Sequence, residues 1–295
     1  MIVVVLYTVV LLFVDRNGVS NQCMRALEQW YQHMIPSLFP MMLFSSVLVD
    51  TGIAEKIGCF LAGTLLRPFK ISKAGGYCLL SGFLFGFPMG AKTTADMCNK
   101  GQMSKEEGNY LLSFINCIGP MYTLHVIHTL FSNYAIFELL IGIYGLPFLY
   151  GLVLRYTKYK STNFGVYKTE SHNKSIFDAL YDCVPSASKS MVYLGGYMIL
   201  FQISFVAIEH LLRVFHLETN LIYPLLEITG GFYMLPKSTL LSFVLFYTIW
   251  GGLSCFLQSY SFIKPSGLSM RSYVLHKTIL GSLGLLLGFV LTVIP

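Results

Sequence analysis

The fold class follows from the stretch Ser81-Gly82-Phe83-Leu84-Phe85-Gly86-Phe87-Pro88-Met89-Gly90-Ala91-Lys92-Thr93-Thr94-Ala95-Asp96. It begins as a membrane-grade apolar helix, is interrupted by Gly86, Pro88 and Gly90, and ends in polar side chains. A broken helix at bilayer depth leaves unpaired N–H and C=O groups, each of which costs several kcal/mol in hydrocarbon. Such a break is tolerated only inside protein or beside a wet cavity, and breaks of this kind form substrate and ion sites in secondary transporters.

The composition indicates an integral membrane protein. The chain of 295 residues is 55% hydrophobic and 12% charged, whereas an average soluble domain carries about 25% charged residues. A soluble protein of this composition would expose large apolar patches. The 23 Phe and 19 Tyr residues suit lipid contact and the aromatic belts at a membrane surface. We therefore expect an all-α polytopic membrane protein that forms a single integral membrane domain.

Several segments are apolar enough to cross a bilayer, which takes about 20 residues. They are 35–50 (with a continuation toward 66), 108–130, 134–154, 190–212, 239–257 and 274–295. Two further apolar segments, 75–97 and 222–238, are too short to cross the bilayer twice, and Gly and Pro interrupt both. We expect each of them to be a re-entrant helical hairpin, with a kinked ordinary helix as the alternative.

Basic residues set the expected orientation. The loop 155–174 contains Arg155, Lys158, Lys160, Lys168 and Lys174, which the positive-inside rule places in the cytoplasm. The clusters Arg67, Lys70, Lys73 and Lys264, Arg271, Lys277 then fall on the same side. In this arrangement the two hairpins open to opposite sides, as in an inverted repeat. We expect repeat 1 at 35–154 and repeat 2 at 175–295, preceded by an N-terminal helix and an interfacial helix within 1–34.

Short motifs recur in the same order in both halves and support the repeat. Ile35-Pro36-Ser37 corresponds to Val184-Pro185-Ser186, and each follows a polar helix that we expect to be interfacial, at 23–34 and 175–183. Leu111-Leu112-Ser113-Phe114 corresponds to Leu240-Leu241-Ser242-Phe243. Their common order favours shared ancestry over chance.

Four residues after the first break are candidates for solute binding. Gly90 lets the backbone approach a ligand, Lys92 supplies a positive charge, and Thr93 and Thr94 supply hydroxyl groups at a helix N-terminus. The alternative for Lys92 is a position at the cytoplasmic interface, and we expect it to pair with Asp96 at i, i+4. The alternative for the two threonines is helix capping.

Two further candidate groups lie at the other breaks. Asn116 precedes Gly119-Pro120, where a kink or an unwound segment is expected, and it could bind either a freed carbonyl or a substrate. Glu227, with Thr229 beside it, is an acid at membrane depth that could carry a coupling proton; the alternative is a pair with Lys237. The expected structural breaks are Gly86, Pro88, Gly119, Pro120, Gly230, Gly231, Gly251 and Gly252.

Motifs of soluble enzymes are absent. The sequence has no Walker A, GxSxG, HExxH or GxGxxG motif, and none of its seven Cys forms a CxxC pair. We therefore expect no enzymatic activity, no cofactor and no metal site. The expected partners are a small-molecule solute, a coupling proton or sodium ion, and the lipid bilayer. We expect no nucleic-acid partner. The sequence leaves open whether the protein forms a homo-oligomer.

Three motifs carry a family resemblance. They are Ile35-Pro36-Ser37-Leu38-Phe39-Pro40, the hairpin motif Gly82-Phe83-Leu84-Phe85-Gly86-Phe87-Pro88-Met89-Gly90-Ala91-Lys92, and Phe114-Ile115-Asn116 before Gly119-Pro120. From about Ala26 to its end the chain resembles the YlbJ-type sporulation integral membrane proteins. The family's double Asn is Asn116-Cys117 here.

The resemblance implies a Gate domain, also called the nucleoside recognition domain, which is similar to the core of concentrative nucleoside transporters. It implies a bacterial cell membrane and a transporter or exporter of a small organic solute. For sporulating members the solute most often invoked is dipicolinate, a planar dianion, and the nucleoside-like alternative is a neutral solute. A second function class is a non-transporting membrane scaffold that acts in spore-envelope maturation.

Overall fold

Helices make up all the regular structure in the ranges that the computed structural model describes, which are residues 10, 13–64, 66–164, 174–214 and 220–293. The expected all-α class is confirmed. Within these ranges, five helical stretches are long and apolar enough to cross a membrane, so the protein is a multi-pass membrane protein. They are Arg16–Asp50, Ile136–Tyr156, Ile176–Glu209, Leu241–Ser266 and Met270–Val293. Most of the expected N-terminal helix, and Lys168 of the basic loop, lie outside the described residues.

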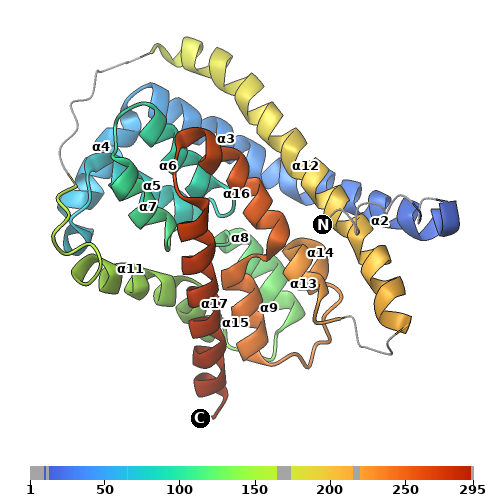
Figure 1. Ribbon diagram of the computed structural model, residues 1–295. Helices are drawn as coiled ribbons and strands as arrows, with labels where there is room; N and C mark the ends of the chain where they lie inside the picture. The colour runs from blue at the N-terminus through green and yellow to red at the C-terminus, as the bar shows by residue number, and fades with distance from the viewer. Residues whose placement is uncertain (1–9, 11–12, 65, 165–173, 215–219, 294–295) are drawn as a thin grey trace.

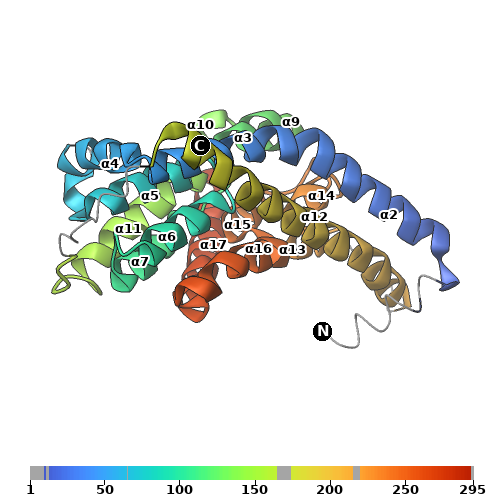
Figure 2. The ribbon, with the colours of Figure 1, turned by 90° about the horizontal axis from the view of Figure 1, so that it is seen from above.

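Two long helices pack along each other (Figures 1 and 2). The first comprises α2 (Arg16–Gln29), a π-helical turn (Trp30–Met34) and α3 (Ile35–Asp50), and the second is α12 (Ile176–Val214). The segments 23–34 and 175–183, which we expect to be interfacial, are helical and each continues into the following span. Their position at the membrane interface stays a prediction. The π-helical turn directly precedes Pro36, whose missing N–H would otherwise interrupt the helix.

The segment expected as the first hairpin contains two helices with a turn between them. They are α5 (Lys73–Leu84) and α6 (Met89–Asn99), and they follow α4 (Ile53–Gly63) and a short 3₁₀ turn (Arg67–Phe69). Helices α4 and α5 approach closely, because a Cβ atom on Gly58 would lie 1.8 Å from the carbonyl oxygen of Lys73. Whether this pair is re-entrant stays a prediction.

The expected span 108–130 is interrupted. Helix α7 (Lys105–Leu112) ends well before α8 (Pro120–Tyr122), and residues 115–119 have no regular secondary structure. Pro120 disfavours a helical conformation at Gly119, so the helix restarts only at the proline. A π-helical turn (Thr123–Ile127) and α9 (His128–Leu130) complete this segment. The next span consists of α10 (Ile136–Leu140), a π-helical turn (Ile141–Gly145) and α11 (Leu146–Tyr156).

The second half ends in three long helices. After α13 (Tyr223–Leu226) and α14 (Ile228–Phe232) come α15 (Leu241–Trp250), α16 (Gly252–Ser266) and α17 (Met270–Val293). Helices α15 and α17 lie side by side (Figure 1), and a Cβ atom on Gly288 would be 2.5 Å from the Cα atom of Ser242. The helical direction changes between α15 and α16 at Gly251, whose φ of 90° lies in the left-handed region that glycine tolerates. The inverted repeat stays a prediction.

Candidate functional site

The turn between α5 and α6 meets both broken segments at the centre of the protein. A Cβ atom on Gly86, which has a φ of 78°, would lie 2.4 Å from the backbone nitrogen of Gly119. A Cβ atom on Gly251 would lie 2.8 Å from Cζ of Phe87. The hairpin turn thus contacts the α7–α8 break through one glycine and the α15–α16 break through its aromatic ring. Such close approach requires residues without a side chain at these positions.

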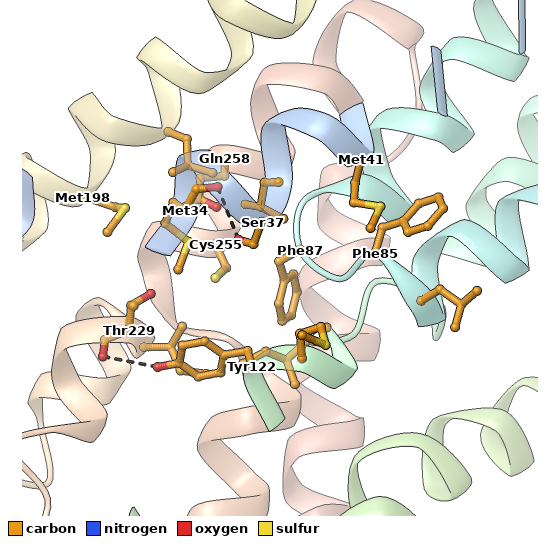
Figure 3. Close-up of a pocket in the computed structure, with 17 residues that line it drawn as sticks. Met34, Ser37, Met41, Phe85, Phe87, Tyr122, Met198, Thr229, Cys255 and Gln258 are labelled. Carbon is orange, nitrogen blue, oxygen red and sulfur yellow. Dashed lines mark hydrogen bonds between the residues drawn. The ribbon is translucent and has the colours of Figure 1, made fainter. Parts of the chain in front are cut away.

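A cavity of about 120 Å³ lies beside this junction (Figure 3). We call it the central cavity. Its lining comes from α3, the hairpin turn, the α7–α8 break, α12, α14 and α16. It consists of Met34, Ser37, Leu38, Met41, Leu84, Phe85, Phe87, Ile118, Gly119, Met121, Tyr122, Leu194, Met198, Ile228, Thr229, Cys255 and Gln258.

The central cavity is apolar with a few hydrogen-bonding groups. None of the lining side chains carries a formal charge, and polar atoms come chiefly from Ser37, Thr229 and Gln258. Tyr122 donates its hydroxyl proton to the carbonyl oxygen of Thr229 at 3.3 Å (Figure 3). Met41 and Met121 of the lining are partly exposed at the protein surface. Thioether and aromatic walls with sparse polar groups are typical of sites for small organic molecules.

A buried lysine lies behind the wall of the central cavity. Lys277 is 1% exposed, and its Nζ atom donates to the carbonyl oxygen of Asn116 at 2.8 Å. The same Nζ atom lies 4.6 Å from the centroid of the Phe87 ring, which lines the cavity. Lys277 is therefore wrongly grouped by sequence with the exposed residues Lys264 and Arg271. It lies seven residues after the start of α17 at Met270, which is about 10 Å along the helix axis.

The Asn116 side chain is fully engaged inside the protein. Its Oδ1 atom accepts from the backbone N–H of Ala91 at 3.3 Å, in the first turn of α6. Its Nδ2 atom donates to Oγ of Ser259 at 3.0 Å and to the hydroxyl of Tyr273 at 2.8 Å. The side chain thus joins α6, α16 and α17 in this structure, and substrate binding by Asn116 stays a prediction. Ser259 and Tyr273 belong to no motif that would single them out.

The other candidates near the first break do not line the central cavity. Lys92 pairs with Asp96 at 2.7 Å, as expected from their spacing, and donates to Oγ of Ser46 at 3.3 Å. Thr93 and Ser81 share a hydrogen bond of 2.8 Å between their hydroxyl groups.

Two further residues of this group are used in packing within the first half. Thr94 donates to the carbonyl oxygen of Gly90 at 2.7 Å. A Cβ atom on Gly90 would lie 3.1 Å from the Cα atom of Gly82. Pro88 is the N-cap residue of α6. Solute binding by Gly90, Lys92, Thr93 and Thr94 therefore stays a prediction.

Glu227 caps α14. Its two carboxylate oxygens accept from the backbone N–H groups of Thr229 at 2.8 Å and Gly230 at 2.6 Å. Glu227 is 1% exposed, whereas Lys237 is exposed. The carboxylate is thus held by its own helix rather than by the lysine that the sequence offers as a partner. Of this group, only Thr229 lines the central cavity.

The glycines of segment 222–238, which we expect to be the second hairpin, and Gly252 bring α13, α14 and α16 together. A Cβ atom on Gly231 would lie 2.5 Å from the nitrogen of Pro224, and one on Gly252 would lie 2.8 Å from the Pro224 carbonyl oxygen. A Cβ atom on Gly230 would lie 2.8 Å from Nε2 of Gln202 on α12. These positions hold the wall that carries Thr229 against the helices around it.

The cap at Glu227 predicts a specific cost of substitution. Glu227→Gln keeps one acceptor oxygen but turns an NH₂ group toward a buried backbone N–H, so one donor of α14 loses its partner. We expect a loss of about 1–3 kcal/mol in the free energy of unfolding. The thermal midpoint of the purified protein measures this loss.

Glu138→Gln is the matched control for this change, because Glu138 also accepts from a helix N-terminus, at 2.9 Å from the Ala135 nitrogen. Its environment is solvent-accessible, so water can replace the lost bond. Equal midpoints for the two variants would contradict the capping role of Glu227.

Comparison with known proteins gives one informative similarity. The chain is 26% identical over 300 residues to the sporulation integral membrane protein YlbJ of Bacillus subtilis (strain 168), covering 86% of this chain and 73% of that protein. No family model matches the chain, and no solved structure matches it. Because the similarity covers most of the chain, it includes residues of both halves. The chain is therefore similar to a YlbJ-type integral membrane protein over most of its length, which supports the resemblance drawn from its motifs.

Proposed function

We propose that the protein is a secondary transporter or exporter of a small organic solute, which binds in the central cavity. The observation that carries this proposal is the position of the cavity, where the hairpin turn and the broken segments of both halves meet. Interrupted helices at membrane depth are tolerated only inside protein or beside a wet cavity, and in secondary transporters such breaks form the substrate site. A scaffold would have no use for such breaks around a cavity.

The lining favours a flat solute with few polar groups. Phe85, Phe87 and Tyr122 offer ring surfaces, and methionines on α3 and α12 offer polarisable contacts that adapt to the shape of a ligand. Ser37, Thr229 and Gln258 offer hydrogen bonds at separate points of the wall. Dipicolinate and a nucleoside-like base both contain a planar ring. The base is neutral like the lining, whereas dipicolinate carries two negative charges for which the lining side chains offer no formal counter-charge. These two are the solutes to test first.

Solute exchange across proteoliposomes tests the proposal. Purified protein is reconstituted, and exchange of labelled dipicolinate, uridine and succinate is followed against protein-free vesicles. We expect at least one of the three to exchange. Ser37→Trp should reduce this exchange by about tenfold or more, equivalent to ~1.4 kcal/mol, because the indole occupies the cavity.

Ser20→Trp is the control for the added indole, since Ser20 is an exposed residue of α2 in the same long helix. It should exchange solute at the rate of the wild type. Absence of exchange for all three solutes in the wild type, or equal rates for the two tryptophan variants, would count against the proposal and favour the scaffold.

A further inference from the structure

Lys277 is a cation held by groups that do not neutralise it. The Asn116 carbonyl oxygen accepts from Nζ at 2.8 Å, and the face of the Phe87 ring lies 4.6 Å from it. A carbonyl of a non-helical segment and an aromatic face are groups that bind a cation through their dipole and quadrupole. Among the described residues, no carboxylate is within ion-pair distance of Nζ. An ionisable group of this kind in a membrane span indicates function.

The titratable groups that face Lys277 are two thiols and a phenol. Cys117 in the α7–α8 break and Cys255 on α16 both interact electrostatically with the ammonium group. Tyr273, on α17 itself, donates no bond to Lys277 and is held by Asn116 and Ser259. Glu227 interacts electrostatically with Cys255 and does not pair with Lys277. The groups that the α7–α8 break, α16 and α17 place around the Lys277 ammonium are therefore neutral.

Lys277 also connects three elements that would have to move relative to one another during transport. Phe87 belongs to the hairpin turn, Asn116 to the α7–α8 break, and Lys277 to α17. Glu227, by contrast, has both oxygens occupied by the N–H groups of its own helix. A change in the charge of Lys277 would alter contacts among three elements at once, whereas Glu227 is bound chiefly by its own short helix, with a further contact to Gln202 of α12.

We propose that Lys277 is the binding site of the coupling ion and that this ion is a proton. The inference rests on the proposed function as a secondary transporter. In the present arrangement the protonated amine holds the Asn116 carbonyl and the Phe87 ring. Because Phe87 lines the central cavity, displacement of its ring exposes Nζ to the cavity.

The transfer step is a simple acid dissociation. One N–H bond of the ammonium breaks, the proton passes to a water molecule in the cavity, and the electron pair stays on Nζ. The neutral amine attracts the ring and the carbonyl less than the ammonium does. The hairpin turn and the α7–α8 break are then free to separate, which couples the proton to movement of the cavity walls.

The ratio of protons to solute molecules tests this role. Full-length protein is reconstituted with a pH-sensitive dye inside the vesicles, and uptake of labelled dipicolinate, uridine or succinate is recorded together with the internal pH. The wild type should move a fixed, non-zero number of protons per solute. In Lys277→Met and Lys277→Arg the ratio should fall to near zero, because a thioether binds no proton and a guanidinium does not release its own. Lys264→Met, at an exposed lysine of α16, should keep the wild-type ratio.

The outcomes separate the two proposals. Solute exchange with an unchanged proton ratio in Lys277→Met, or with no proton movement in the wild type, would overturn the role of Lys277 and leave the transporter standing. No exchange of any probe in the wild type would overturn both. If Lys277→Met and Lys277→Arg both elute as folded protein but exchange no solute, the lysine binds the solute directly and the proton role is wrong.

Discussion

Gly58→Ala is expected to leave little folded protein, because the change strongly destabilises the packing of α4 on α5. The added Cβ atom would lie 1.8 Å from the carbonyl oxygen of Lys73 and 2.9 Å from its carbonyl carbon. Both are backbone atoms, so no side-chain rotation relieves the clash and α4 must move away from α5. Gly76 adds to the effect, because its own Cβ position lies 2.6 Å from the Gly58 carbonyl oxygen. We expect a cost of about 3 kcal/mol or more, the upper range for overpacking.

Gly63→Ala in the same helix provides the matched control. No atom lies within 4 Å of its Cβ position, so alanine should be neutral or slightly stabilising there. Thermal denaturation followed by size-exclusion chromatography in detergent compares the two variants with the wild type. If Gly58→Ala and Gly63→Ala denature at the same temperature, α4 and α5 do not pack at this distance.

Asn116→Ala is expected to have the second largest effect. The substitution leaves the Ala91 N–H without its acceptor and removes the donor that joins the hydroxyls of Ser259 and Tyr273. Each buried polar group that loses its partner costs about 1–3 kcal/mol. The same change leaves a void where α6, α16 and α17 meet. We therefore expect a strong loss of thermal stability together with loss of solute exchange.

Asn99→Ala tests whether this effect depends on position, because Asn99 ends the same helix α6 but is exposed. Its thermal midpoint should remain that of the wild type. Asn116→Asp adds a second comparison, since aspartate keeps the acceptor for Ala91 but removes both donors. If Asn116→Ala is as stable as Asn99→Ala, the hydrogen bonds of Asn116 contribute little to the fold.

The breaks in the helices could be predicted from the sequence because their cause is local. Proline at 120 removes a backbone donor and restricts Gly119, and the pair Gly251-Gly252 permits positive φ angles. The i, i+4 pair of Lys92 and Asp96 is local for the same reason. Hydropathy likewise identified the long apolar helices, since length and composition alone decide whether a helix can cross a bilayer.

The environment of Lys277 could not be predicted, because it depends on contacts between distant segments. A lysine in the first turns of an apolar helix usually extends toward the membrane surface. Its burial follows from the rotation of α17, which turns this side chain toward Asn116 and Phe87. The same limit applies to the continuity of α2 with α3, where proline and polar residues suggested a boundary. The structure bridges that boundary with a π-helical turn.

Several contacts of the folded protein join segments that the ribosome releases at very different times. Lys277 follows its partner Asn116 by 161 positions, and Met191 follows Trp30, whose indole it binds, by the same interval. Since chains are made from the N-terminus at about 5–20 residues per second, the first half waits for many seconds before its partners emerge. During that interval the Asn116 carbonyl and the inner face of α3 must contact other molecules, such as lipid, water or an insertase. The lining of the central cavity is therefore complete only after α16 has been made, and the Asn116 carbonyl gains Lys277 only with α17.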